Sequence, residues 1–172
     1  MVELKARVSA LAPVRRRIHD LGALHIGTFR QTDVYFKVPE GRLKLRQVEG
    51  KNTAELIYYE RKNVADPKRS NVFILEIQNP ASLNNVLEKI LETRVTVEKS
   101  REIYQYQGTQ IHVDTVKGLG VFVELERTTS SKTKAIEKDQ QTLEELRKKL
   151  GIEREDFCRL SYGELIKKPN ME

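Results

Sequence analysis

The chain has 172 residues, of which 38% are hydrophobic and 33% are charged, and its net charge is +6. This length allows one well-formed core, and the basic excess favours an anionic partner. The lone Cys158 excludes an intramolecular disulfide and fits a cytoplasmic protein. No apolar run is long enough to cross a membrane, and the chain has no block of basic residues that would favour binding to nucleic acid.

Hydrophobic periodicity predicts an α+β fold. Alternation of apolar and polar residues predicts strands over residues 2–8, 24–38, 42–48, 53–61, 72–77, 95–106, 110–116 and 120–127. Helical spacing predicts helices over residues 13–21, 81–92, 135–150 and 154–166. We expect a mobile loop over 63–71, one domain over 1–168 and a tail over 169–172. Eight strands joined mostly by hairpins predict an antiparallel sheet large enough to close.

The charged face of the first strand carries both signs, but those of several later strands are sorted by sign. An antiparallel sheet with one solvated face also alternates, but such a face ordinarily mixes both signs. Here the opposite faces are strongly apolar and amphipathic helices are available to cover them, so we expect the charged faces to line a cavity. The basic faces carry Arg42, Lys44, Arg46, Lys99 and Arg101. The acidic faces carry Asp114, Glu124 and Glu126.

A cavity with both signs suits a phosphate chain chelated by a metal ion. The guanidinium fork of arginine matches two phosphate oxygens, and carboxylates suit Mg²⁺ or Mn²⁺. The P-loop pattern is absent, because the segment Gly118-Leu-Gly120 lacks the spacing to a Lys-Ser/Thr pair. We expect His112, beside Asp114 on the same face, to be a buried polar filler.

Several segments together resemble the CYTH superfamily, the triphosphate tunnel fold of class IV adenylyl cyclases, thiamine triphosphatases and inorganic triphosphatases. The resemblance covers nearly the whole chain. It rests on Val2-Glu-Leu-Lys-Ala6, Leu21-Gly-Ala23, Gln31-Thr-Asp-Val-Tyr-Phe36, Leu43-Lys-Leu-Arg46, Lys99-Ser-Arg101 with Tyr104, and His112-Val-Asp-Thr-Val-Lys-Gly-Leu-Gly-Val-Phe-Val-Glu-Leu-Glu126. The segment Ser161-Tyr-Gly-Glu-Leu-Ile166 resembles the end of the cyclase-like branch.

The resemblance implies a closed eight-stranded antiparallel β-barrel with a charged interior, flanked by helices and accessible from both ends. It implies that Mg²⁺ or Mn²⁺ is held by Glu3, Asp114, Glu124 and Glu126. It implies that the triphosphate is bound by Lys5, Arg42, Lys44, Arg46, Arg61, Arg69, Lys99 and Arg101. Lys5 is also the candidate catalytic residue, through activation of water.

One departure from the family pattern concerns the metal ligands. The family opens with Glu-x-Glu-x-Lys, and Met1 stands where the first glutamate is expected. The resemblance favours adenylyl cyclase-like chemistry on ATP. A triphosphatase acting on tripolyphosphate, thiamine triphosphate or a nucleoside triphosphate stays open, as does a non-catalytic binder. We expect a triphosphate small molecule as partner, neither membrane nor nucleic acid, and leave a homodimer open.

Overall fold

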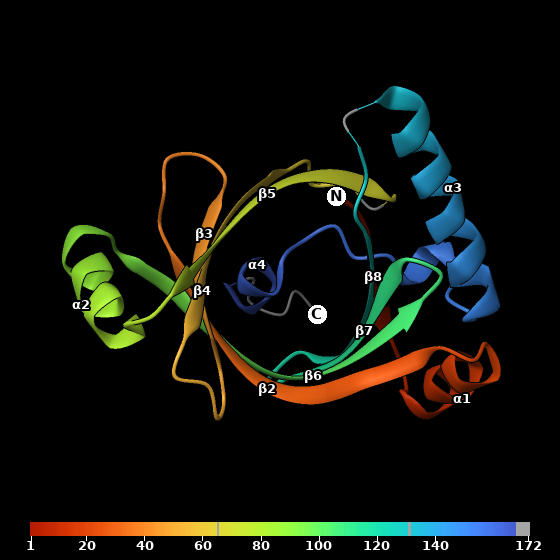
Figure 1. Ribbon diagram of the computed structural model, residues 1–172, viewed down its shortest axis with the longest axis horizontal. Helices are drawn as coiled ribbons and strands as arrows, with labels where there is room; N and C mark the ends of the chain where they lie inside the picture. Colours follow the sequence, from red (N-terminus) through yellow and green to blue (C-terminus); the bar gives the residue numbers. More distant parts are fainter. Residues whose placement is uncertain (65, 131, 168–172) are drawn as a thin grey trace.

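The computed structural model describes residues 1–64, 66–130 and 132–167, so the expected tail over 169–172 lies outside the described residues. Eight antiparallel strands form a closed barrel in the order β1-β5-β4-β3-β2-β6-β7-β8, which confirms the predicted fold (Figure 1). The elements are β1 (Val2–Val8), α1 (Ala12–Asp20), β2 (Leu24–Phe36), β3 (Arg42–Val48), β4 (Ala54–Arg61), β5 (Lys68–Ile77), α2 (Pro80–Ile90), β6 (Thr93–Tyr106), β7 (Thr109–Val116), β8 (Gly120–Arg127), α3 (Thr133–Lys149), the 3₁₀ turn η1 (Arg154–Asp156) and α4 (Tyr162–Lys167). None of the helices described is long and apolar enough to cross a membrane.

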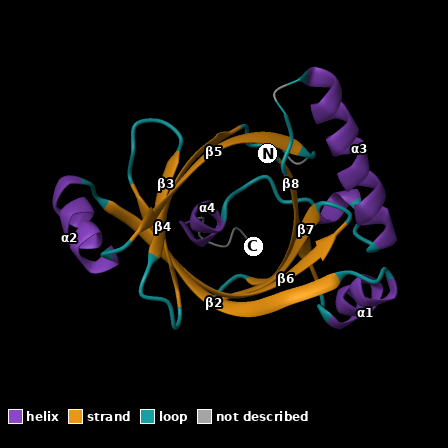
Figure 2. Cartoon of the chain, viewed as in Figure 1, coloured by secondary structure: helices purple, strands orange, loops and turns teal. Residues whose placement is uncertain are grey.

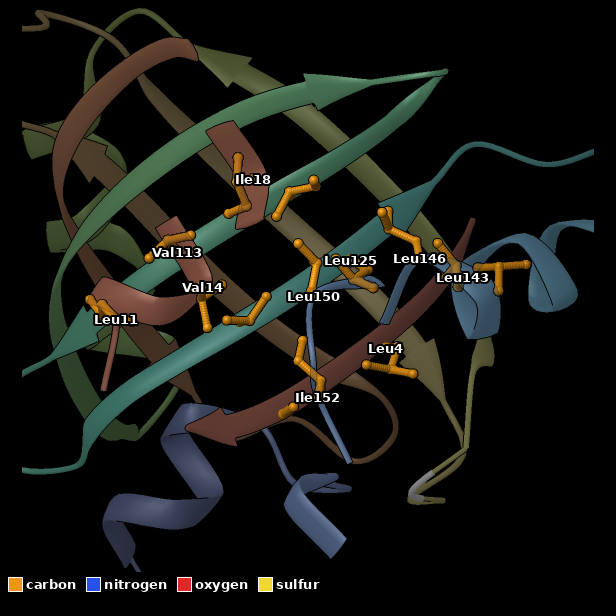
Figure 3. Packing of buried hydrophobic residues seen from close by; sticks show 14 residues of the cluster. Leu4, Leu11, Val14, Ile18, Val113, Leu125, Leu143, Leu146, Leu150 and Ile152 are labelled. Atoms are coloured by element: carbon orange, nitrogen blue, oxygen red, sulfur yellow. The ribbon is translucent and has the colours of Figure 1, made fainter. Parts of the chain in front are cut away.

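The helices α1, α2 and α3 lie outside the barrel (Figure 2). The helices α1 and α3 pack on β1, β7 and β8, where Ile18 and Leu143 meet Leu125 in a cluster of buried apolar side chains (Figure 3). The helix α2 contributes Leu87 to a second cluster on the outer face of β2, β3 and β4. The apolar outer faces of these strands pack against the helices, and the charged faces of the same strands point into the barrel.

The expected helix over 154–166 is wrong in its first part. The short turn η1 is followed by an extended segment, and only Tyr162–Lys167 is helical after it. The extended segment follows β1: Phe157 forms a β-bridge with Ala6, and the Cys158 N–H donates to the Lys5 carbonyl at 2.8 Å. These strand-like bonds compete successfully with the helical periodicity and lead the chain into α4, within the outline of the barrel (Figure 1).

The expected loop over 63–71 is also shorter than predicted. The strand β5 begins at Lys68, four residues before the expected start, and residue 65 lies outside the described residues. Lys68 pairs with Glu3, and Arg69 with Val2. These two pairs join β5 to β1 and complete the barrel, so the residues of the expected loop are needed for closure.

The packing predicts that Leu125 is essential for stability, because its side chain is fully buried beneath α1 and α3. The substitution Leu125→Ala should lower the free energy of unfolding by about 2–5 kcal/mol, measured by urea denaturation. Leu24→Ala is the matched control, since Leu24 is 66% exposed. Similar losses in the two variants would contradict the described packing.

Candidate functional site

The barrel encloses a cavity of about 430 Å³. Seven basic side chains and four glutamates line it. The basic residues are Lys5, Lys44, Arg46, Lys51, Arg61, Lys99 and Arg101, and the acidic ones are Glu3, Glu55, Glu124 and Glu126. A volume of this order is typical of small-molecule sites, and the excess of cations favours an anionic ligand.

A fully buried carboxylate, Asp33 on β2, organises the basic wall. Its oxygens accept hydrogen bonds from Lys44 at 2.8 Å, from Lys99 at 2.8 Å, and from Arg46 Nε at 2.8 Å and Nη2 at 3.0 Å. One negative charge on β2 therefore holds three positive charges from the two flanking strands, β3 and β6. The group carries a net charge of about +2 if all four side chains are ionised, and this charge faces the cavity.

Burial and neighbouring charges set the ionisation of this group. Burial opposes ionisation of Asp33, but Arg46, Lys44 and Lys99 outweigh it and hold the pKa of the carboxyl well below its usual value. Burial, assisted by repulsion from Arg46, lowers the pKa of Lys44 to about 8. Burial also lowers the pKa of Lys99 well below its usual value, although Asp33 acts in the opposite direction. The basic wall is therefore under electrostatic strain that an added anion would relieve.

Arg101 on β6 connects the two walls. Its guanidinium donates to both oxygens of the fully buried Asp114, at 2.8 and 2.6 Å, and also to Glu124. The Tyr162 hydroxyl donates to Asp114 at 2.7 Å. Lys5 pairs with Glu124 at 3.0 Å. Burial raises the pKa of Glu124, but Lys5 and Arg101 prevail and lower it well below its usual value.

The acidic wall joins β1, β7 and β8. Glu3 forms an ion pair with Arg61, and Glu126 projects beside His112. One ligand atom from each of His112, Glu124 and Glu126 can be chosen so that all three lie within 4.8 Å of one another. His112 Nδ1 is buried without a hydrogen-bond partner among the described residues. This donor set fits a divalent cation, because carboxylates and a neutral imidazole are ordinary metal ligands.

The helix α4 covers one end of the cavity, so the expectation of two accessible ends is wrong for the described chain. The Tyr162 ring packs edge-on against Phe122, with ring centroids 5.0 Å apart, and Lys5 Nζ lies 3.9 Å from its centre. Arg42 Nη2 donates to Glu164 Oε1 at 2.9 Å, which ties α4 to β3. The helix α4 therefore forms the floor of the cavity.

The opposite end has a rim of apolar side chains, to which Lys51 is added, since its Nζ lies 6.0 Å from the centre of the Phe29 ring. Inward-facing residues of β2 run from Phe29 through Asp33 to Tyr35, which lies beside Gly163 of α4. Phe29 therefore lies at the end away from α4. Val48, Ile74 and Ile103 also line the cavity. The charged interior and the apolar rim together suit an anion that carries an organic group.

Two residues expected at the phosphate site lie elsewhere. Arg69 is exposed on the outer face, because β5 turns its buried neighbour Lys68 inward instead. Arg42 lies at the α4 end, bound to Glu164, and does not line the main cavity. Asp114, expected among the metal ligands, lies behind Arg101 with both oxygens accepting hydrogen bonds.

The remaining expected site residues come together around the cavity. They are Glu3, Lys5, Lys44, Arg46, Arg61, Lys99, Arg101, Glu124 and Glu126, and Met1 also lines it. The sequence analysis missed Asp33, Lys68 and Tyr162. Asp33 carries a signal, because Gln31, Asp33 and Tyr35 alternate with Thr32, Val34 and Phe36. Tyr162 carries no such signal in the sequence, because its contact with the cavity depends on the position of α4 in the fold.

Comparison with known proteins agrees with this architecture. The CYTH domain family model matches residues 1–162. The chain belongs to the CYTH family. A protein of Methanocaldococcus jannaschii named as a candidate adenylate cyclase is 26% identical over 95% of this chain and 97% of its own length.

Solved structures of CYTH-like proteins share the fold of this family member. A Pyrococcus horikoshii protein superimposes with a TM-score of 0.87 at 25% identity, over 95% of this chain and 98% of its own. A Hippeastrum protein, named as a candidate adenylyl cyclase and described as having a dominant triphosphatase activity, superimposes with a TM-score of 0.61 at 18% identity, over 88% of each chain. The latter likeness shows the fold alone.

Asp33 predicts a stability effect that an anion should reverse. The substitution Asp33→Asn leaves three buried cations without their shared carboxylate and should lower the free energy of unfolding by about 3–5 kcal/mol in a urea titration. Tripolyphosphate should restore part of this loss, because it supplies negative charge to the same cations. Glu98→Gln is the control, since Glu98 is 53% exposed in its pair with Lys117. Equal stability of the two variants would exclude the organising role of Asp33.

The lowered pKa of Lys44 predicts opposite pH effects on binding and stability. Lys44 lies against Asp33, Arg46, Arg101, Tyr35 and Tyr59, and its pKa of about 8 is below the 10.5 of a free lysine. Above pH 8 the folded protein holds fewer protons than the unfolded chain, so this group makes stability rise with pH. The affinity for tripolyphosphate should fall over the same range, by up to about tenfold per pH unit for one proton.

The test is calorimetric titration with tripolyphosphate one pH unit below and one above 8, together with urea unfolding. Lys44→Arg should weaken the pH dependence of binding, because arginine keeps its proton. Affinity that stays constant across pH 8 in the unaltered protein would contradict this assignment.

Proposed function

We propose that this protein binds a metal-chelated nucleoside triphosphate in its barrel and catalyses adenylyl cyclase-like chemistry on it. The observation that carries the proposal is the cavity itself, with a cationic wall around Asp33 facing a carboxylate wall that includes Glu124 and Glu126. Neither a simple anion nor a simple cation matches both walls. A triphosphate with a bound divalent ion matches both walls, because its phosphate oxygens can face the cationic wall while the metal ion faces the carboxylates.

Ligand binding would exchange partners inside the cavity. Lys44, Arg46 and Lys99 share one carboxylate, and donors left over on each can turn to phosphate oxygens. Lys5 and Arg101 are held by Glu124 in the same way. A cation on Glu124 would compete with Lys5 and Arg101, and so direct both toward the phosphate chain. The site is thus organised before the ligand arrives, which limits the reorganisation needed for catalysis.

The chain's own residues then position the reacting groups. A divalent ion, Mg²⁺ or Mn²⁺, would be held by Glu124 and Glu126 with Glu3 nearby, and it would neutralise phosphate charge. Lys5 lies at the covered end, 3.3 Å from the Leu160 carbonyl. We assign Lys5 to stabilise negative charge that develops on a phosphate oxygen, because an ammonium group offers only donors. Asp33 and Asp114 serve as positioning residues for the cations.

In the cyclase reaction, the ribose 3′-oxygen attacks the α-phosphorus, its proton passes to a base or to solvent, and pyrophosphate leaves with the electrons of the broken bond. The apolar rim of Phe29, Val48, Ile74 and Ile103 favours a substrate with an organic group at the outer end of the cavity. The name carried by the Methanocaldococcus relative supports the same reaction.

The second candidate is a triphosphatase, in which water attacks the terminal phosphorus and loses its proton to a base or to solvent. The rest of the phosphate chain leaves with the electrons of the broken bond, and the attacked phosphorus is released as orthophosphate. The activity described for the Hippeastrum neighbour favours it. The same cationic wall would serve both reactions, because both place charge on non-bridging phosphate oxygens.

The decisive experiment incubates the protein with ATP or tripolyphosphate and Mg²⁺ or Mn²⁺ and separates products by mass. Cyclic AMP with pyrophosphate supports the first candidate, and orthophosphate supports the second. Arg46→Ala should lower kcat/KM by about 100-fold or more, since it removes an organised phosphate donor. Arg30→Ala is the control, because the Arg30 side chain is 79% exposed.

Three outcomes would count against the enzymatic proposal. Thermal stabilisation by ATP without turnover would make the protein a non-catalytic binder. Equal kcat/KM in the two arginine variants would show that the reaction does not take place in the cavity. Full activity of the Glu126→Gln variant would show that Glu126 is not a ligand of the metal ion.

A further inference from the structure

The imidazole of His112 faces the acidic wall with a buried ring nitrogen that lacks a hydrogen-bond partner among the described residues. Its ring is almost fully buried, with 4% of the side chain exposed. Its Nδ1 lies 3.9 Å from Glu124 Oε2 and 3.7 Å from Glu126 Oε1, beyond hydrogen-bond distance in both cases. The atom has no hydrogen-bond partner among the described residues. A buried nitrogen without a partner is costly, so it indicates a role that involves another species.

The other ring nitrogen fixes the tautomer. His112 Nε2 lies 3.1 Å from Gln110 Oε1. An amide oxygen can only accept, so Nε2 carries the hydrogen in this bond. In the neutral ring, the lone pair of Nδ1 then points toward the two glutamates. Lone pairs and carboxylates repel one another unless a cation lies between them.

We propose that His112 Nδ1, Glu124 and Glu126 together hold a divalent transition-metal ion, such as Mn²⁺ or Co²⁺, in preference to Mg²⁺. This inference rests on the proposed metal-dependent function and specifies the ion. The candidate ligand atoms lie within 4.8 Å of one another. Imidazole suits transition metals, whereas Mg²⁺ prefers oxygen ligands. Three protein ligands also leave positions open for phosphate oxygens, as is typical of catalytic metal sites.

Gln110 acts as the positioning residue in this arrangement. Metal-binding histidines ordinarily donate their second ring N–H to an acceptor, which orients the ring and strengthens the ligand. Gln110 on β7 supplies that acceptor two residues from His112. The Glu126 carboxylate has no lysine, arginine or histidine nitrogen within 4 Å in the described ranges except His112 Nδ1, so it is free to bind metal beside the ring.

The alternative is a protonated His112 that only balances the charge of the two glutamates. In that state Nδ1 would carry a hydrogen directed toward the acidic wall and could not bind metal. The two accounts predict different effects on metal binding when the nitrogen at this position is replaced by oxygen. Asparagine places an amide oxygen near the position of Nδ1, so His112→Asn replaces nitrogen by oxygen with little change in shape.

The experiment measures equilibrium binding of Co²⁺ and of Mg²⁺ to the full chain without substrate, and records the visible spectrum of bound Co²⁺. His112→Asn should weaken Co²⁺ binding by at least about tenfold, shift its spectrum, and leave Mg²⁺ binding nearly unchanged. Gln110→Leu should weaken Co²⁺ binding by about tenfold and spares the fold, because Gln110 is exposed. His19→Asn is the matched control, since the His19 side chain is 92% exposed on α1.

An unchanged Co²⁺ affinity and spectrum in His112→Asn would overturn the proposal and favour the protonated histidine. Equal weakening of Co²⁺ and Mg²⁺ would also overturn it, because His112 would then only shape the site. Mg²⁺ binding alone, with triphosphate turnover intact, would overturn this inference but leave the proposed function standing. Failure to bind either ion would overturn both.

Discussion

The barrel depends on pairing charges that it encloses. Isolated ions inside a protein cost several kcal/mol each, so a charged interior requires close counter-charges. Asp33 supplies the most concentrated case, with Lys44, Arg46 and Lys99 all within hydrogen-bond distance of one carboxylate. Asp114 likewise accepts hydrogen bonds from Arg101 and from the Tyr162 hydroxyl. These two buried carboxylates fix the cations that face the cavity and leave them with donors to spare.

The arrangement links stability to function. A hydrophobic interior of the same volume would be more stable in isolation, because desolvation of charges is avoided. Two clusters of buried apolar side chains instead lie outside the strands, against α1, α2 and α3. The barrel is thus stabilised largely from its outer surface, while its interior holds the charged groups and a smaller apolar cluster of Tyr35, Val97 and Phe122 with Tyr162. The helix α4 completes this division, since Tyr162 contacts both the apolar ring of Phe122 and the carboxylate of Asp114.

Strand alternation predicted an antiparallel sheet large enough to close, and the resemblance to the CYTH superfamily supplied the closed eight-stranded barrel and most of its charged lining. Sorting of signs between strands indicated a cavity, and Arg46, Lys99 and Glu126 do lie on its wall. Local pattern fails where a residue's role is set by distant parts of the chain. Arg69 and Lys68 are adjacent and both basic, and only the register of β5 with β1 decides which one turns inward.

The C-terminal segment illustrates the same limit. Its apolar spacing predicts a helix, but edge-to-edge bonds with β1 hold residues around Phe157 and Cys158 in an extended form. Those bonds exist only once the barrel has formed. His112 was expected to be a polar filler, and the metal-binding role proposed for it depends on Gln110 and on the glutamates of β8. Sequence identifies the chemical groups, whereas the fold decides which of them meet.

The central claim is that a metal-chelated triphosphate replaces internal ion pairs within the barrel. A crystal structure with Mn²⁺ and a non-hydrolysable ATP analogue tests it most directly. The account predicts phosphate oxygens within hydrogen-bond distance of Arg46, Lys99 and Arg101, and Mn²⁺ bound to Glu124 and Glu126. An analogue bound on the outer surface, with the Asp33 and Glu124 ion pairs unchanged, would contradict it.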